Sequence, residues 1–282
     1  MIAITGATGQ LGQKTVASLA SRIPAADIVA IVRDPAKAEG LGVAVRQADY
    51  EDPAALEKAL AGVDTLLLIS SSVVGSRAAH HANVIAAAKK AGVKHIVYTS
   101  LLHADRLDIG LADEHNQTEA ALRDSGLAFT VLRNGWYWEN NTASLGQSLE
   151  HGMIAGSAGD GRIAWASRQD FAEAAAAVLA GSGHEGKIYE LAGDTGHTLA
   201  ELAAEAARQS GKKLEYKDMG QAEYAAFLES VGMPAAFAAT LAEVDTQAVA
   251  AGQLDDDSRT LSKLIGRPTT TLSEAVAEAL RG

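Results

Sequence analysis

The stretch Gly6-Ala7-Thr8-Gly9-Gln10-Leu11-Gly12 directly follows a short apolar run, Ile2–Thr5, and begins a segment with helical periodicity. A strand, a glycine turn and a helix in this order are typical of a site for a dinucleotide pyrophosphate. We expect Gly6 to permit the turn, Gly9 to admit the phosphates, and Gly12 to let the helix pack closely on the strand. The N–H groups of the first helical turn would then bind the anion. All seven residues are therefore predicted to form the cofactor site, although a turn that serves packing alone is the alternative.

The next strand end indicates which dinucleotide binds. The apolar run Ile28–Val32 is typical of a buried parallel strand, and Arg33 stands at its carboxyl end. Folds that bind NAD usually carry an acid there, which accepts a hydrogen bond from the ribose 2′-hydroxyl and would repel a 2′-phosphate. A guanidinium instead pairs with that phosphate. Arg33 therefore favours NADP(H), while the neighbouring Asp34 weakens this signal and a solvated loop arginine is the alternative.

The rest of the chain alternates between apolar β-rich runs and helical segments. Strands are expected near residues 43–46, 65–69, 95–99, 128–132 and 187–191, with helices near 53–60, 82–91, 113–125, 172–180 and 199–209. Near-continuous apolar strands separated by helices indicate a parallel sheet covered on both faces. We predict an α/β, Rossmann-type doubly wound parallel sheet over residues 1–134. Residues 135–282 are predicted to form a smaller, helix-rich lobe that returns to the sheet near 187–191.

Composition excludes several classes of protein. The 282-residue chain has no cysteine, which rules out disulfides, thiolate metal ligands and a cysteine nucleophile. Its formal net charge of −11 opposes binding to nucleic acid or to anionic membranes. No signal peptide or long apolar span is visible, so a cytoplasmic protein is expected. No spacing of histidines and carboxylates suggests a metal site.

Ligands of such sheets bind beyond the carboxyl ends of the strands, so the residues there are the candidates for the site. A dense group of aromatic and amide side chains follows the sixth strand, in a chain with only 5% aromatic residues. Such side chains suit a flat conjugated ligand, although Trp136 and Trp138 could instead cap the core. The further cofactor candidates are Ser70, Ser71, Thr99, Asn134, Gly135, Trp136, Tyr137, Trp138 and Glu139. The candidates for the substrate pocket are His103, Trp136, Tyr137 and Asn140.

Several segments together resemble a known family. They are Gly6–Gly12, 32–35, 47–50, 98–105, 132–137, 159–161, 183–187, 189–194 and 264–272. With these segments the chain resembles the NmrA-like atypical short-chain dehydrogenase/reductases, in particular their quinone-reducing members, over nearly its whole length. The resemblance implies NADPH-dependent reduction of a quinone. The alternative is a regulator of the same family that senses NADP(H) without catalysis.

One departure from ordinary short-chain dehydrogenases bears on the chemistry. Those enzymes carry a Tyr-x-x-x-Lys pair on the helix after the fifth strand, where Leu111 and His115 stand here. Reduction of a ketone needs a positioned acid, whereas reduction of a quinone gives an anion delocalised into the ring, which can take a proton from water. The loss of the pair therefore fits direct hydride transfer to a quinone. His115 is the candidate catalytic residue, and a helix histidine spaced four residues before Glu119 is an equally good interpretation.

Overall fold

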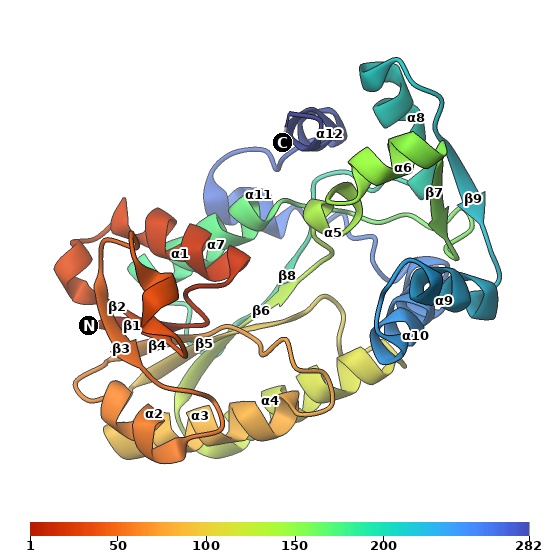
Figure 1. Cartoon of the computed structure of the whole chain (residues 1–282). Coiled ribbons are helices and arrows are strands. Elements are labelled where there is room, and N and C mark those ends of the chain that lie inside the picture. Colours follow the sequence, from red (N-terminus) through yellow and green to blue (C-terminus); the bar gives the residue numbers. More distant parts are fainter. Residues whose placement is uncertain (282) are drawn as a thin grey trace.

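The computed structural model describes residues 1–281, and its centre is a seven-stranded sheet in which every neighbouring pair is parallel. The strand order is β3-β2-β1-β4-β5-β6-β8 (Figure 1). The strands are β1 (Ile2–Thr5), β2 (Ile28–Val32), β3 (Ala44–Gln47), β4 (Thr65–Leu68), β5 (His95–Leu101), β6 (Ala128–Asn134) and β8 (Ile188–Leu191). The predicted doubly wound parallel sheet is thus confirmed.

The order of the strands places a crevice at the centre of the sheet. β1 pairs with β2 on one side and with β4 on the other. The chain therefore builds the sheet outward from β1 in one direction and then from β4 in the other. In open parallel sheets, ligands bind at this reversal, beyond the carboxyl ends of the strands. The loops after β1 and β4 are consequently the two walls of the expected site.

Helices cover both faces of the sheet. On one face α1 (Gln10–Ala20) packs against α7 (Arg168–Ala180), which also contacts α11 (Thr260–Ile265). On the other face α2 (Pro53–Ala59), α3 (Arg77–Ala91) and α4 (Gly110–Ser125) lie side by side (Figure 1). Short 3-10 turns, Ala25–Asp27 and Pro35–Ala38, flank β2. Both faces of the central strands are therefore apolar and buried, as the near-continuous hydrophobic runs predicted.

The C-terminal lobe contains a small sheet that the sequence pattern did not predict. β7 (Met153–Gly156) pairs in parallel with β9 (Glu215–Asp218). Around it lie α5 (Trp138–Thr142), α6 (Leu145–His151), α8 (Leu199–Ser210), α9 (Gln221–Ser230), α10 (Ala235–Glu243), a π-helix (Val244–Val249) and α12 (Leu272–Ala279). Thr198 caps α8 in a capping box with Glu201. Four-residue strands of mixed polarity carry too little pattern to be recognised without their partner.

The division at residues 134 and 135 coincides with the end of β6, and it stays a prediction. α7, β8 and α11 lie after this point in the chain and belong to the layers around the central sheet. Among residues 1–281, no helix is both long and apolar enough to cross a membrane.

Candidate cofactor and acceptor site

The β1–α1 turn has the geometry of an anion site. Gly6 adopts a φ of +60°, which is a left-handed conformation that glycine tolerates best. A Cβ on Gly12 would lie 2.2 Å from the carbonyl oxygen of Gly6, so only glycine allows this approach of helix to turn. Gly9 is the N-cap of α1, and within the described chain no side chain caps the helix there. The first turn of α1 also lacks acidic residues, which leaves its positive end available for a phosphate.

Arg33 lies at the carboxyl end of β2 with its side chain directed into solvent. The side chain is 79% exposed, and its Nε lies 3.9 Å from the carboxylate Oδ2 of Asp49. An exposed ion pair of this length contributes little to stability, so Arg33 can readily leave Asp49 and pair with a phosphate instead. The position is therefore compatible with a 2′-phosphate beside the glycine turn.

The loop after β4 adjoins the glycine turn directly and is joined to β5. A Cβ on Gly6 would lie 3.5 Å from the Cβ of Ile69, the residue that follows β4. The N–H of Ser70 donates to Oγ1 of Thr99 at 2.9 Å, which joins the ends of β4 and β5. Oγ of Ser70 is buried and has no hydrogen-bond partner within residues 1–281. A buried hydroxyl of this kind is expected to have a partner, and a ligand in the crevice would supply one.

The end of β6 brings together several predicted residues. Oδ1 of Asn134 is buried and, among the described residues, has no partner, while its Nδ2 lies 3.5 Å from the hydroxyl of Tyr137. The Tyr137 ring packs edge-on against Phe171 and lies 4.7 Å from the guanidinium carbon of Arg168. Glu139 accepts hydrogen bonds from the backbone N–H of Arg168 at the start of α7. Asn134, Tyr137 and Glu139 therefore share one end of the sheet, as predicted.

Gly135 joins the same end of the sheet through its backbone. Its N–H donates to the carbonyl of Leu191 at 2.7 Å, and a Cβ on Gly135 would lie 3.0 Å from that oxygen. The absent side chain lets the β6 end pack closely on β8.

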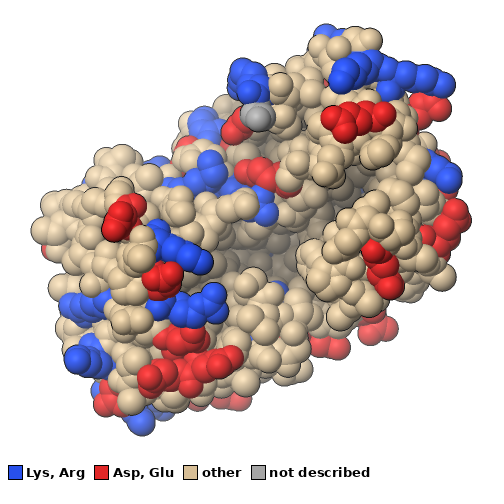
Figure 2. All heavy atoms as spheres, viewed as in Figure 1, with Lys and Arg blue, Asp and Glu red and all other residues tan. Residues whose placement is uncertain are grey.

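These residues fit a dinucleotide. The turn offers N–H groups for the pyrophosphate, and Arg33 offers a cation for a 2′-phosphate. The unpartnered acceptors on Ser70 and Asn134 suit the hydroxyl and amide donors of a ribose and a nicotinamide. Figure 2 shows that the visible face of the molecule is hollowed between the central sheet and the lobe that carries α9 and α10. The depth of this hollow is coloured as neither acidic nor basic residues, which suits an uncharged, flat acceptor.

Trp138 does not lie with these residues. Its side chain is 2% exposed, stacks on Trp165 with ring centroids 4.7 Å apart, and donates from Nε1 to the carbonyl of Thr270. The pair forms the centre of the lobe core. This placement favours a core role for Trp138 and gives no support to its contact with the cofactor. Trp136 is half-buried and also packs against the lobe core.

The two remaining residues proposed for the substrate pocket already have partners. His103 is buried and adopts a φ of +54°, with Nδ1 2.9 Å from the carbonyl of Gln253 and Nε2 3.3 Å from Asp256. Asn140 is exposed and accepts a hydrogen bond from Arg168. His103 therefore fixes the loop after β5 to the C-terminal segment, and its role in the pocket stays a prediction.

His115 is buried on α4 and has a contact at each ring nitrogen. Nε2 lies 3.4 Å from Nη1 of Arg77, and Nδ1 lies 2.8 Å from the hydroxyl of Tyr98. Because Arg77 can only donate, Nε2 accepts and the Nδ1–H donates to Tyr98. Burial, with the adjacent Arg77 charge, holds the pKa of His115 well below its usual range. This geometry gives no support to direct proton transfer from His115 to a substrate. The alternative, a helix pair between His115 and Glu119, is also not formed, since Glu119 binds Arg133.

Sequence reasoning missed the side chains that hold the loop after β4. The N–H of Ser71 donates to Nε2 of His81, and the carbonyl of Ser71 accepts from Nε of Arg77, at 2.9 and 2.8 Å. Nδ1 of His81 contacts Thr118 of α4. Burial, followed by the Arg77 charge, lowers the pKa of His81 to about 3. No local pattern marks these residues, because their partners lie in other elements.

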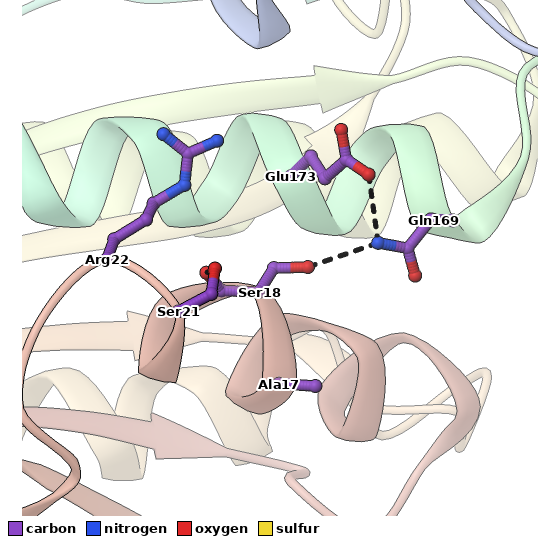
Figure 3. Close-up of a pocket in the computed structure, with 6 residues that line it drawn as sticks. All are labelled: Ala17, Ser18, Ser21, Arg22, Gln169 and Glu173. Atoms are coloured by element: carbon purple, nitrogen blue, oxygen red, sulfur yellow. Dashed lines mark hydrogen bonds between the residues drawn. The ribbon is translucent and has the colours of Figure 1, made fainter.

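A separate groove lies between α1 and α7 (Figure 3). It encloses about 310 Å³ and is lined by Ala17, Ser18, Ser21, Arg22, Gln169 and Glu173. Gln169 of α7 donates across the groove to Oγ of Ser18 on α1, and it also donates to Glu173 on its own helix (Figure 3). The groove lies at the opposite end of α1 from the glycine turn, so it is not part of the crevice.

Comparisons with known proteins agree with this geometry. Residues 6–182 match a family described as NAD(P)H-binding. Quinone oxidoreductase 2 of Escherichia coli is 60% identical over 280 residues, which cover 98% of each chain. The crystal structure of NADPH-dependent quinone oxidoreductase 2 from E. coli with NADPH has a TM-score of 0.96 at 59% identity, covering 99% of this chain and 100% of that one. A triphenylmethane reductase of Citrobacter sp. with NADP(H) has a TM-score of 0.94 at 40% identity, covering 99% and 100%.

Proposed function

Because this chain belongs to the NAD(P)H-binding family, we propose that it is an NADPH-dependent oxidoreductase that reduces quinones by direct hydride transfer. Whole-chain identity of 60% to a quinone oxidoreductase supports the acceptor class. Similarity to structures that contain NADPH and NADP(H) supports the cofactor. The sequence motifs that resemble those of the NmrA-like reductases agree with this acceptor class and with this cofactor.

One observation from the geometry carries the proposal. A glycine turn suited to phosphate adjoins the loop after β4, and two buried polar atoms beyond the strand ends, Oγ of Ser70 and Oδ1 of Asn134, have no hydrogen-bond partner within the described residues. The crevice lies at the reversal of strand order, where dinucleotides bind. Arg33 stands at the end of β2, within the part of the site where an adenosine 2′-phosphate is expected.

The absence of a tyrosine at position 111 bears on the choice of acceptor. NADPH supplies a hydride, which gives a quinone two electrons and leaves an aromatic oxyanion. That anion needs no strong acid, so water in the open cleft can deliver the proton. The chain then contributes mainly binding and orientation, with the nicotinamide and the quinone held face to face. Tyr137 is half-buried at the strand end and offers a flat surface for this arrangement.

We also propose a partner and a cellular location. The partner is a small quinone, without nucleic acid or membrane, and the location is the cytoplasm, where NADPH is maintained as a reductant. The net charge of −11 favours both exclusions. Cell fractionation of the tagged chain tests the location.

Parallel assays with different cofactors and acceptors test the function. We expect loss of the NADPH absorbance band when a small quinone is present, with a much lower rate for NADH and no loss without an acceptor. Simple ketones should give no reaction, which serves as the control for acceptor class. Binding of both oxidised and reduced cofactor without turnover on any quinone would contradict the proposal and favour an NADP(H) sensor.

A further inference from the structure

The loop between β4 and α3, residues 70–76, forms one wall of the crevice. It begins directly after Ile69, whose Cβ would lie 3.5 Å from a Cβ placed on Gly6. Ser70 is joined to Thr99 at the end of β5. A dinucleotide that extends from the glycine turn toward β5 therefore passes along this loop. The conformation of the loop determines whether its polar atoms meet the ligand.

The outer surface of the loop provides no hydrophobic anchor. Residues 72–75 are exposed, and the side chains of Val73 and Val74 leave 46% and 44% of their area to solvent. Loops with few buried apolar contacts are the parts of a protein that open most easily. The conformation of this loop must therefore depend on polar contacts from beneath.

Glu114 of α4 supplies two of those contacts. Its Oε1 accepts hydrogen bonds from the N–H groups of Gly75 and Arg77, at 3.0 and 3.1 Å. The two N–H groups belong to the last turn of the loop and the first turn of α3, where no helical partner exists. This contact between residues 39 positions apart also explains why α3 begins at Arg77, five residues earlier than its sequence pattern predicted.

Arg77 closes the arrangement from the other end of the loop. Its Nε donates to the carbonyl of Ser71 at 2.8 Å, and its Nη1 lies 3.7 Å from Oε2 of Glu114. The side chains of Arg77 and Glu114 are only 8% and 12% exposed. Burying such a pair costs desolvation, and an apolar pair would often be at least as stabilising. The pair therefore makes more sense as a way to fix one loop conformation than as a source of stability.

We infer that Glu114 and Arg77 are positioning residues that hold the β4–α3 loop in the conformation that receives the nicotinamide half of NADPH. At opposite ends of the loop, Ser71 accepts from Arg77 and Gly75 donates to Glu114, so the buried ion pair links the two ends, while His81 also holds the N–H of Ser71. Loss of the pair would leave the loop sampling other conformations, so the apparent affinity for NADPH would fall in proportion to the competent fraction. The inference rests on the proposed function for the identity of the cofactor.

Glu114→Gln is the principal test, because it keeps the size of the side chain and removes its charge. We expect the dissociation constant for NADPH, measured by fluorescence titration without a quinone, to rise about tenfold if the competent fraction falls to about one tenth. The KM for NADPH should rise to a similar extent, while kcat at saturating NADPH changes less than about threefold. Amide hydrogen exchange of residues 72–77 should become faster, a change that global destabilisation would not confine to this loop.

Asp113→Asn is the matched control, since it removes the same charge from the adjacent, exposed position of α4. It should leave both the dissociation constant and the exchange pattern unchanged. If Glu114→Gln does not fold, Gly75→Ala is the second variant, because Gly75 has a φ of +89° and open space around it. Alanine there disfavours the loop conformation without a clash and without disturbing buried charge, so it should also weaken NADPH binding.

Unchanged NADPH affinity together with faster loop exchange would overturn the inference, and so would equal affinity losses in Glu114→Gln and Asp113→Asn. Because binding is measured without an acceptor, failure of the proposed function gives a different result. In that case the wild type binds NADPH but reduces no quinone, while the effect of Glu114→Gln on binding persists.

Discussion

The phosphate half of the site and its nicotinamide half are built in different ways. The phosphate half is main chain: a left-handed Gly6, a close approach at Gly12 and the free first turn of α1. The nicotinamide half is shaped by side chains from separate helices, such as His81 and Glu114, which hold the loop after β4 from beneath. In the proposed site, a local backbone motif would thus bind the part that all dinucleotides share. Long-range contacts shape the part where chemistry occurs.

This difference has consequences for tolerance to substitution. A backbone site fails through steric clash, because an added atom has nowhere to go. A site shaped by a polar network is disrupted when one of its groups loses its charge or gains a proton, because the groups that it contacts are buried and are then left without a matching partner. The two halves should therefore respond to different perturbations.

The largest effect is expected for Gly12→Ala, which attacks the backbone half. The new Cβ would lie 2.2 Å from the carbonyl oxygen of Gly6 and 2.7 Å from the Cα of Ala7, both main-chain atoms that cannot rotate away. We expect a loss of roughly 3 kcal/mol or more in the free energy of unfolding, at the upper end for overpacked positions. NADPH affinity should fall more than about 100-fold. Chemical denaturation and fluorescence titration measure the two effects.

Gly146→Ala is the control for that variant. Gly146 is the second residue of α6, with nothing within 4 Å of its added Cβ. Alanine there should stabilise the protein by about 0.5–1 kcal/mol through helix propensity. Equal effects of the two substitutions would show that Gly12 is not required for close packing.

Acidification should affect the nicotinamide half through His81. This histidine is fully buried, and burial lowers its pKa to about 3, against about 6.5 in the unfolded chain. Between these values the unfolded state binds the extra proton, so stability falls as the pH drops below about 6.5. At pH 5, His81 should lower the free energy of unfolding by about 2 kcal/mol. Urea denaturation at pH 5 and pH 8 measures it.

His81→Gln isolates this contribution from the other titrating groups. A glutamine amide oxygen can still accept from the N–H of Ser71 but does not titrate. The lowered pKa of His115 adds to the acid sensitivity, while burial raises the pKa of Asp245 to about 6 and acts in the opposite sense. We therefore expect the stability of the variant to depend less on pH than that of the wild type. An identical pH dependence would remove His81 from this role.

The same contrast explains what could be predicted from the sequence. The sheet, its two helical layers and the glycine turn follow from local patterns, because each buried strand of four or five apolar residues shows its own signal. The contact of Glu114 with the loop depends on residues 37 and 39 positions away, and no periodicity records it. Trp138 lies in a cluster of aromatic and amide residues that is typical of a ligand site. Its stacking partner Trp165 is distant in the sequence, so no local motif indicates the contact. β7 and β9 likewise gave no recognisable signal, because each is a four-residue strand whose partner lies about 60 positions away in the chain.

A smaller effect is expected for Arg33→Ala, which tests specificity within the phosphate half. Removal of one charge-assisted contact should weaken NADPH binding by about 10- to 100-fold and leave NADH unaffected. The weakening should itself diminish at high salt, because the guanidinium is exposed. Comparison of kcat/KM for NADPH and NADH in wild type and variant measures it. Arg22→Ala removes an exposed charge at the far end of α1 and should change neither value. Equal losses for both cofactors would refute the assigned contact with the 2′-phosphate.

The smallest change in turnover is expected for His115→Asn, which separates a chemical role from a positional one in the nicotinamide half. A proton donor contributes about 10²- to 10⁴-fold to a rate, so its removal would lower kcat at saturating NADPH by at least that factor. His115 is instead buried between Arg77 and Tyr98, and its lowered pKa keeps it neutral near pH 7. We therefore expect kcat to fall less than about threefold, with a larger rise in the KM for NADPH because Arg77 loses a contact. The solvent isotope effect on kcat should stay the same, since the proton still comes from water. A 100-fold lower kcat with an altered isotope effect would restore His115 as the acid and would require the loop to open during the reaction.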